Sequence, residues 1–358
     1  MRSLTTRFLP HRKPSSFVMR TAAFAAVYLI WGSTFLAIHY AIESYPPFLM
    51  LGVRFGLAGA LMYGVLRYRG HVKPSRSHMR SSIWMGVLLL FVGTGSIAWA
   101  EAYIPTGLAA MLIATVPMWV VLLEWLWLKG PKPAPRILFA LGTGLVGVAV
   151  VVQPPAQVAG DISYFVAIGV SLLAAFSWSF GSLLGRKMEL PESPFMGAAL
   201  QMMAGGVVLS LFGIITGELS RISLSSITLT SSMAVLYLLL FGSLVAFSAY
   251  VWLMHHVSAS RLSTHAFVNP IVAVLMGTLV AGEALTIRIG ISGVLLVTAV
   301  VVIVGAGTHS PARIRSRLKR RFAIHRSDVL MAASLSDSHP PVPRNRHLHP
   351  QPGRKHSD

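Results

Sequence analysis

Runs of about 20 apolar residues recur along most of this chain and limit its fold more than any other feature. A helix of that length spans the hydrocarbon core of a bilayer, which is roughly 30 Å thick. Only 11% of the 358 residues are charged, whereas about a quarter are charged in an ordinary soluble domain. Because a spanning segment must satisfy its backbone polar groups internally, the chain is predicted to be an all-α polytopic membrane protein.

The apolar runs divide into ten predicted transmembrane helices joined by short linkers. Glycine, proline and charged residues interrupt the runs and set the ends of the helices. The predicted helices cover residues 21–42, 47–68, 81–103, 106–128, 136–152, 164–185, 195–217, 232–254, 261–281 and 287–306. No small-residue cleavage site follows the first of them, so it is expected to remain in the mature protein.

Basic residues are concentrated on one side of this predicted topology. Of the 30 lysines and arginines, all but Arg54, Arg221 and Arg288 lie in the two ends of the chain and in alternate loops. Basic loops stay in the cytoplasm, which predicts an inner-membrane protein with both termini cytoplasmic. Residues 1–20 form a basic N-terminus, and 307–358 are predicted to be a disordered basic tail. The net charge of +19 belongs to these flanks, so nucleic acid is not expected as a partner.

The two halves of the chain resemble each other. Trp31 precedes Trp178 by 147 residues, and at the same offset Arg54 matches Gln201. At an offset of 150, Leu88-Leu-Leu-Phe91 matches Leu238-Leu-Leu-Phe241. Since each half contains five helices, the second copy enters the membrane in the opposite sense, giving inverted repeats over residues 21–152 and 164–306. Such repeats are typical of transporters, because two opposed copies can expose one site to each side in turn.

Three ionisable side chains, Arg54, Glu101 and Glu124, lie well inside predicted helices. Such groups cost roughly 2.5 to 3.5 kcal/mol on insertion and are therefore candidates for function. Arg54 and Glu101 have compatible depths in the external half, so they are predicted to form a pair in one cavity, with Glu101 the candidate for proton coupling. A pair that only fixes packing is the open alternative. Glu124 and Glu283 are expected at the membrane interfaces.

Two prolines occupy equivalent positions in the fourth and ninth predicted helices. Pro117 and Pro270 each remove a helical hydrogen bond and are predicted to break their helices, which would mark the substrate site. Aromatic, hydroxyl and amide side chains near these breaks are expected to line the cavity. The candidate cavity residues are Trp31, Ser33, Arg54, Glu101, Pro117, Trp178, Gln201, Tyr250, His265, Asn269 and Pro270.

The sequence lacks the motifs of the enzyme classes considered. It contains no His-Glu-x-x-His zinc helix, no Gly-x-Ser-x-Gly elbow and no Walker loop. It also contains no cysteine, which excludes disulfides, cysteine-based metal sites and thiol catalysis. No enzyme activity, metal or cofactor is therefore predicted, and uphill transport would depend on an ion or solute gradient.

Several motifs are similar to those of a known family. They are Tyr28-Leu-Ile-Trp-Gly-Ser-Thr-Phe35, Gly52-Val-Arg54-Phe55, Ala114-Thr-Val-Pro117, Phe176-Ser-Trp-Ser-Phe-Gly181, Val268-Asn-Pro270 and Gly282-Glu283. Together they resemble the EamA family of the drug/metabolite transporter superfamily, most closely its YedA-like branch, over residues 20–306. The first half departs from the pattern, because Lys129-Gly130-Pro131 stands where many relatives have Gly-Glu.

The resemblance implies ten helices in two inverted repeats around a central cavity, and export of small metabolites such as amino acids, or of drug-like compounds. It implies that Trp31, Glu101, Trp178, Tyr250, His265 and Asn269 lie near that cavity. The combined interpretation is a secondary transporter that works by alternating access in a lipid bilayer, with proton coupling left open. An uncoupled facilitator and a non-transporting scaffold or sensor acting through the tail are the alternatives, and a monomer and a homodimer are both allowed.

Overall fold

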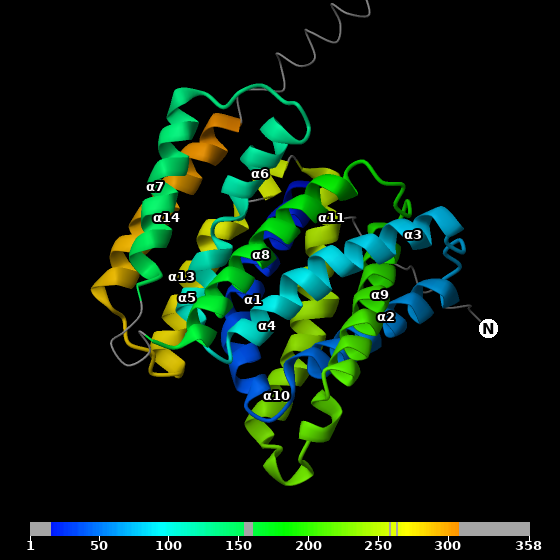
Figure 1. Cartoon of the computed structure of the whole chain (residues 1–358). Coiled ribbons are helices and arrows are strands. Elements are labelled where there is room, and N and C mark those ends of the chain that lie inside the picture. The colour runs from blue at the N-terminus through cyan, green and yellow to red at the C-terminus, as the bar shows by residue number, and fades with distance from the viewer. Residues whose placement is uncertain (1–15, 154–159, 258, 263, 308–358) are drawn as a thin grey trace, which may run out of the picture. The chain divides into compact units, whose positions relative to one another are not determined.

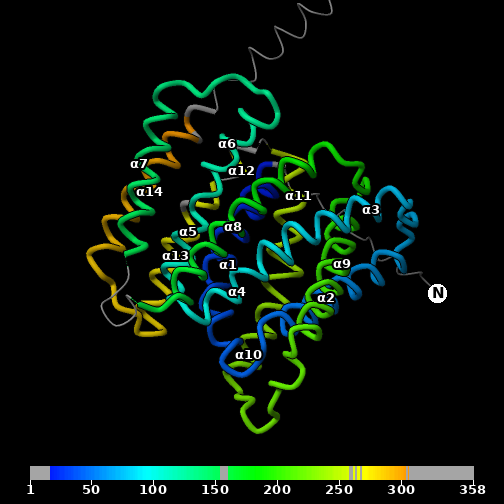
Figure 2. The backbone as a smooth tube through the Cα atoms, in the orientation of Figure 1, coloured from blue at the N-terminus to red at the C-terminus, as the bar shows by residue number. Residues whose placement is uncertain are grey.

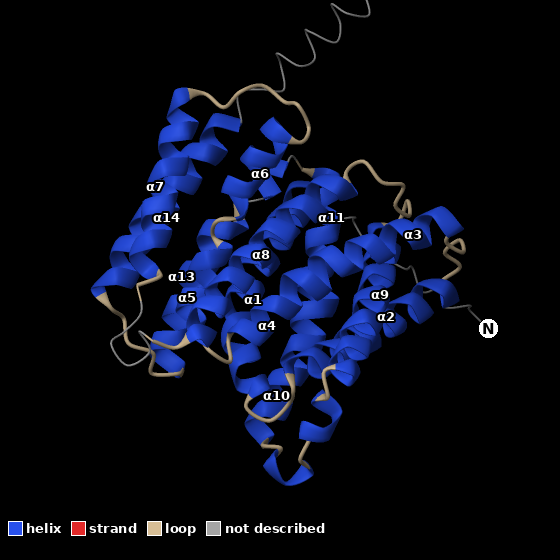
Figure 3. Cartoon of the chain, in the orientation of Figure 1, coloured by secondary structure: helices blue, strands red, loops and turns tan. Residues whose placement is uncertain are grey.

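The computed structural model describes residues 16–153, 160–257, 259–262 and 264–307. Within these ranges every regular element is a helix and no strand occurs (Figure 3). Most of the predicted basic N-terminus and nearly all of the predicted tail, residues 1–15 and 308–358, lie outside the described residues.

Ten apolar helical segments confirm the predicted number of transmembrane helices. Seven are long and apolar enough to cross a membrane, and three are shorter. The segments are α1 (Ser16–Ile42), α2 (Pro47–Tyr68), α3 (Arg76–Met85) with η1 (Gly86–Gly95) and α4 (Ser96–Ala100), α5 (Thr106–Ile113) with α6 (Val116–Leu126), α7 (Pro135–Val151), α8 (Ile162–Gly185), α9 (Pro194–Ile215), α10 (Leu229–Tyr237) with η5 (Leu238–Phe247) and α11 (Ser248–His256), α12 (Ala259–Leu262) with α13 (His265–Val280), and α14 (Ile287–Gly307).

The third and eighth segments each contain a π-helical centre, which the sequence analysis did not predict. η1 and η5 are both 10 residues long and contain the repeated Leu-Leu-Leu-Phe motif. In each, a hydroxyl donates to the carbonyl five residues earlier, Thr94 to Leu89 at 3.3 Å and Ser243 to Leu238 at 3.3 Å. The equivalent irregularity in both halves matters because π-helical turns are frequent at functional sites.

The two halves pack with matching neighbours. α2 lies along α9 and α7 lies along α14, so equivalent helices pair across the molecule. α1 packs against α13, just as α8 packs against α5 and α6. α1 and α8 run in opposite directions through the bundle (Figures 1 and 2). This is the arrangement expected of two inverted five-helix repeats.

Glycines allow α2 and α9 to approach closely. A Cβ atom added to Gly59 would lie 2.7 Å from the Ala199 carbonyl oxygen and 2.7 Å from the Met203 nitrogen. A Cβ on Gly206 would lie 2.5 Å from the Gly56 nitrogen. Since these neighbours are backbone atoms, no side-chain movement could relieve the clash. Small residues therefore fix the central contact between the repeats, as in other membrane helix pairs.

Two glutamates from the second half cap helices of the first half. α2 and α5 follow Pro46 and Pro105, which have no side chain that could cap them. Glu218 instead accepts hydrogen bonds from the Phe48 and Leu49 backbone nitrogens, at 3.3 and 2.8 Å. Glu283 accepts from the Thr106 backbone nitrogen and hydroxyl, at 2.8 and 2.7 Å, and from the Gly107 nitrogen at 3.2 Å.

Glu283 was expected at the membrane interface, and the structure gives it a more specific role. A carboxylate beside a helix N-terminus satisfies free N–H groups and complements the positive end of the helix dipole. The first half has Lys129-Gly130-Pro131 at the matching position. These caps therefore tie the halves together at one end of the bundle, called here the carboxylate end, which holds Glu101, Glu218 and Glu283.

The predicted symmetric break at the two prolines is right in one half and wrong in the other. The fourth segment is interrupted between α5 and α6, at Ala114 and Thr115, just before Pro117. Pro270 lies inside α13, which continues around it. The start of α13 at His265 places Pro270 beyond its first turn. Proline removes only one hydrogen bond, which neighbouring groups in a membrane helix bundle can compensate.

We expect Gly59→Val to reduce the stability of the folded protein by about 1 to 3 kcal/mol or more, because the new side chain meets backbone on α9. Thermal unfolding of the purified protein in detergent measures this. Gly64→Val is the matched control on the same helix, since a Cβ at Gly64 meets nothing within 4 Å. Equal melting temperatures for the two variants would contradict the close contact between α2 and α9.

Glu283→Ala should cost about 1 to 2 kcal/mol through the loss of the α5 cap. Melting temperature is again the measurement, with substitution of the exposed Glu192 by alanine as the control. Hydrogen exchange should also increase at the Thr106 and Gly107 amides. Unchanged protection at both amides would show that Glu283 does not cap α5.

Candidate functional site

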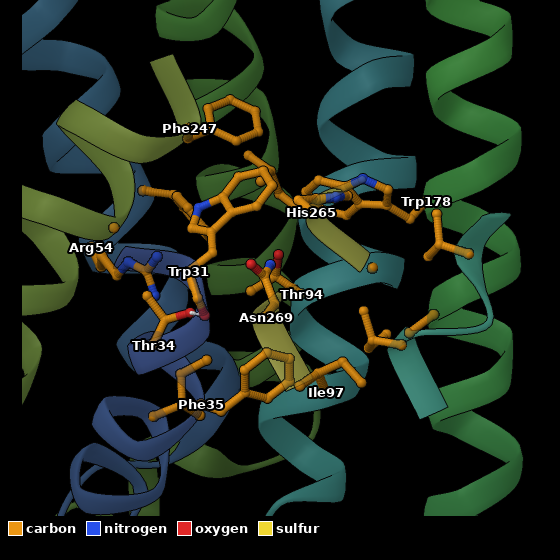
Figure 4. Close-up of a pocket in the computed structure, with 18 residues that line it drawn as sticks. Trp31, Thr34, Phe35, Arg54, Thr94, Ile97, Trp178, Phe247, His265 and Asn269 are labelled. Carbon is orange, nitrogen blue, oxygen red and sulfur yellow. Dashed lines mark hydrogen bonds between the residues drawn. The ribbon is translucent and has the colours of Figure 1, made fainter. Parts of the chain in front are cut away.

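A cavity lies between the two repeats. It contains about 730 Å³ of space unoccupied by protein atoms, part of which is open to solvent. Its walls come from α1, α2, η1, α4, α5 and α6 in the first half and from α8, η5 and α13 in the second. Figure 4 shows the side chains converging on this space. Both π-helical segments line it, so both irregular centres face the cavity.

An aromatic cluster forms one wall of the cavity. The repeat-related Trp31 and Trp178 meet edge to face, with ring centres 5.4 Å apart and an interplanar angle of 88°. The Tyr250 ring lies 4.9 Å from Trp31, and the Tyr250 hydroxyl accepts a 3.0 Å hydrogen bond from Trp178 Nε1. The His265 ring lies 5.6 Å from Trp31. Equivalent residues of the two repeats are therefore in direct contact at one site.

A smaller hollow continues beyond this cluster toward Arg186. It contains about 300 Å³ of unoccupied space, part of it open, and shares Val116 and His265 with the main cavity. Tyr250 and Arg186 also line it. The aromatic cluster thus separates the main cavity from a second space at the end of the bundle opposite the carboxylate end.

Polar groups from α13 complete the wall. Asn269 and His265 are both only 5% exposed and both line the main cavity. In the amide orientation that its neighbours favour, Asn269 Nδ2 donates to the carbonyl oxygens of His265 and Tyr28, both at 3.2 Å. These bonds fix the Asn269 side chain between α1 and α13, beside the tryptophan pair.

Arg54 reaches the cavity from α2. Figure 4 shows its side chain directed toward Trp31 and Thr34. Its Nε donates to Ser243 Oγ at 2.9 Å, and its guanidinium carbon lies 4.4 Å from the centre of the Phe55 ring. Arg54 is 3% exposed, and its Nη1 has no hydrogen-bond partner.

The predicted pair of Arg54 and Glu101 is wrong. No ion pair joins them within the described part of the chain, and Glu101 does not line the cavity. Glu101 lies one turn beyond Ile97, the last cavity residue on α4, and its charged neighbour is Glu283. Both Glu101 carboxylate oxygens are buried without a hydrogen-bond partner. The prediction compared depths alone, and depth does not determine where on the helix surface a side chain points.

The other predicted residues divide into two groups. Trp31, Arg54, Trp178, His265 and Asn269 line the main cavity, and Tyr250 lines the smaller hollow. The predicted residues outside both spaces are Ser33, Glu101, Pro117, Gln201 and Pro270.

Physical reasons for these exclusions are visible in the structure. The Ser33 hydroxyl is 2.7 Å from the Tyr237 hydroxyl, and Gln201 is fully buried with no partner for either amide atom. Sequence reasoning missed other lining residues, among them Phe55, Gly93, Thr94, Gly242 and Phe247. Four of these lie in the π-helical segments, where the repeated Leu-Leu-Leu-Phe motif was the available signal, and the fifth, Phe55, follows Arg54 in the sequence.

Comparison with known proteins places this architecture in a family. The EamA-like transporter family matches the chain twice, over residues 21–153 and 165–305. The chain is 38% identical over 266 residues to the uncharacterized inner membrane transporter YedA of Escherichia coli strain K12, covering 74% of this chain and 83% of YedA.

More distant relatives agree with this match. The uncharacterized transporter YvbV of Bacillus subtilis is 27% identical, with 78% of this chain and 89% of YvbV covered. Protein PecM of Dickeya dadantii is 25% identical, with 84% of this chain and 96% of PecM covered. A crystal structure at 20% identity shares the fold with a TM-score of 0.56, covering 80% of this chain and 96% of the other. The chain therefore belongs to the EamA-like transporter family.

Proposed function

We propose that the protein exports a small amphipathic organic solute by alternating access, using the cavity between its repeats as the binding site. One observation carries this proposal, namely that the repeat-related Trp31 and Trp178 meet at the wall of a single cavity. Exchange of conformations between two opposed repeats would open such a shared site first to one side and then to the other. The aromatic rings suit the apolar body of a solute, and Asn269 and Arg54 supply polar contacts.

The charge distribution supports one orientation of the chain in the membrane. The basic loops that follow α2, α6, α8 and α11 lie opposite the carboxylate end, and by the positive-inside rule they face the cytoplasm. In this orientation the smaller hollow beside Arg186 lies on the cytoplasmic side of the aromatic cluster, and the carboxylate end faces outward. An inner-membrane location with cytoplasmic termini follows from this orientation, and YedA is itself named an inner membrane transporter.

Glu101 is the proposed proton carrier, acting from outside the cavity. Its oxygens have no hydrogen-bond partner and it lies beside a second carboxylate, Glu283. A buried carboxylate without partners is costly unless it takes up a proton. Glu101 lies one turn beyond the cavity residue Ile97 and does not line the cavity itself. This position also supports a second candidate, an uncoupled facilitator in which Glu101 has only a structural role.

Uptake into proteoliposomes tests the transport proposal. Trp31→Ala and Trp178→Ala should each reduce uptake of a transported solute about tenfold or more, since each removes an aromatic wall that contributes roughly 1.5 to 3 kcal/mol. The assay presents labelled amino acids, aromatic acids and aromatic amines to the full-length protein. Trp84→Ala is the control, because Trp84 lies on α3 and is 50% exposed. Equal uptake by all three variants would place the binding site elsewhere.

Proton flux tests the role of Glu101 separately. In liposomes that contain a pH-sensitive dye, a transported solute should move protons with the wild-type protein, and Glu101→Gln should abolish that signal. Substitution of the exposed Glu192 by glutamine is the control. Solute uptake with a flat dye signal in the wild type would instead establish the uncoupled facilitator.

A further inference from the structure

Arg54 is a buried cation without a counter-ion. Among the described residues no aspartate or glutamate lies within ion-pair distance of it, and the acid predicted to neutralise it, Glu101, lies near Glu283 instead. Arginine stays protonated in proteins. A buried charge that lacks an ionic partner is unfavourable, particularly inside a membrane. The described protein groups therefore leave this cation incompletely compensated.

The structure nevertheless holds the guanidinium in place. Ser243 on η5 accepts from Nε, and the Phe55 ring lies against the guanidinium carbon. Gly242 leaves space for the group, because a Cβ there would lie 3.0 Å from Arg54 Nη2. Nη1 has no partner. A fixed guanidinium with a free donor, at the wall of a cavity, has the geometry that recognises carboxylates.

The rest of the cavity matches an anion with an apolar body. No acidic side chain is among its described lining residues, so nothing there would repel a carboxylate. Trp31 and Trp178 present aromatic surface. Aromatic faces also bind cations, but the positive charge of Arg54 would repel a cation in this cavity. Because Arg54 is the one Lys or Arg among the described lining residues, one negative charge balances it.

We infer that the transported solute carries a carboxylate, and that Arg54 binds this group while the tryptophan pair contacts the apolar part of the same molecule. This inference rests on the proposed role of the cavity as the transport site. It selects organic acids with an apolar or aromatic body, including zwitterionic amino acids, over amines and neutral compounds.

A matched set of probes tests the inference. The probes are 3-phenylpropionate, its neutral amide 3-phenylpropionamide, and the cation 3-phenylpropylamine. Binding to the full-length protein is measured by calorimetry, and entry is measured in proteoliposomes. The wild type should bind and transport the acid in preference to the amide and the amine. Arg54→Gln should weaken acid binding at least tenfold, since the charged hydrogen bond is lost, and should weaken amide binding by a smaller factor, since only a neutral acceptor is affected.

Further variants separate charge recognition from misfolding. Arg54→Lys retains the positive charge but lacks the planar guanidinium with its several N–H donors. It should therefore keep part of the preference for the acid that Arg54→Gln loses. Ser243→Ala, which keeps the charge and removes the Nε acceptor, should weaken acid binding severalfold. Arg288→Gln removes an exposed arginine and should change neither acid nor amide binding. If Arg54→Gln does not elute as a monodisperse species, the Ser243→Ala and Arg54→Lys results decide the test.

The outcomes distinguish this inference from the proposed function. Transport of the amide or the amine as readily as the acid, with the same preference after Arg54 substitution, would overturn carboxylate recognition and leave transport intact. If no probe binds or enters, the proposed transport of aromatic solutes fails and the inference fails with it. Acid preference that persists in Arg54→Gln would also overturn the inference, because another group would then recognise the anion.

Discussion

The need to satisfy every backbone hydrogen bond away from water determines where this fold can be irregular. Lipid-facing segments have no alternative to regular helix, whereas backbone that lines a protein cavity can depart from it. Among the described residues, the π-helical η1 and η5 contribute residues to the central cavity, and so do Ile113 and Val116, which flank the interruption between α5 and α6. The backbone therefore departs from regular α-helix at the cavity, in both repeats.

The pairing of equivalent helices explains how one site can belong to both halves. α2 against α9 brings backbone close to backbone through Gly59 and Gly206, and the Trp31 and Trp178 rings meet over the cavity. The symmetry is broken at the carboxylate end, where Glu218 and Glu283 of the second half cap helices of the first. These caps are polar contacts between the repeats at one end of the bundle, and the proposed alternating mechanism would require them to open.

Sequence reasoning could predict the properties that depend on length and pattern. Apolar run length gave the ten helices, and the internal offset identified Trp31 and Trp178 as a pair. Properties that depend on rotation about a helix axis were less accessible, so Glu101 was placed beside Arg54 when it lies near Glu283. The π-helical hydrogen bonds were also missed, because the apolar residues of η1 and η5 fit an ordinary α-helix equally well. Pro270 shows that a proline alone does not establish a break.

Opposite movement at the two ends of the bundle is the most direct test of a shared site with alternating access. The chain has no cysteine, so spin labels can be introduced without removing native residues. One cysteine pair, at Glu43 and Leu285, reports between the repeats at the carboxylate end, and another, at Lys129 and Lys187, reports at the opposite end. Pulsed electron spin resonance should show that a transported solute lengthens one distance while it shortens the other. Two distances that change together, or that do not respond to a solute that is transported, would contradict alternating access.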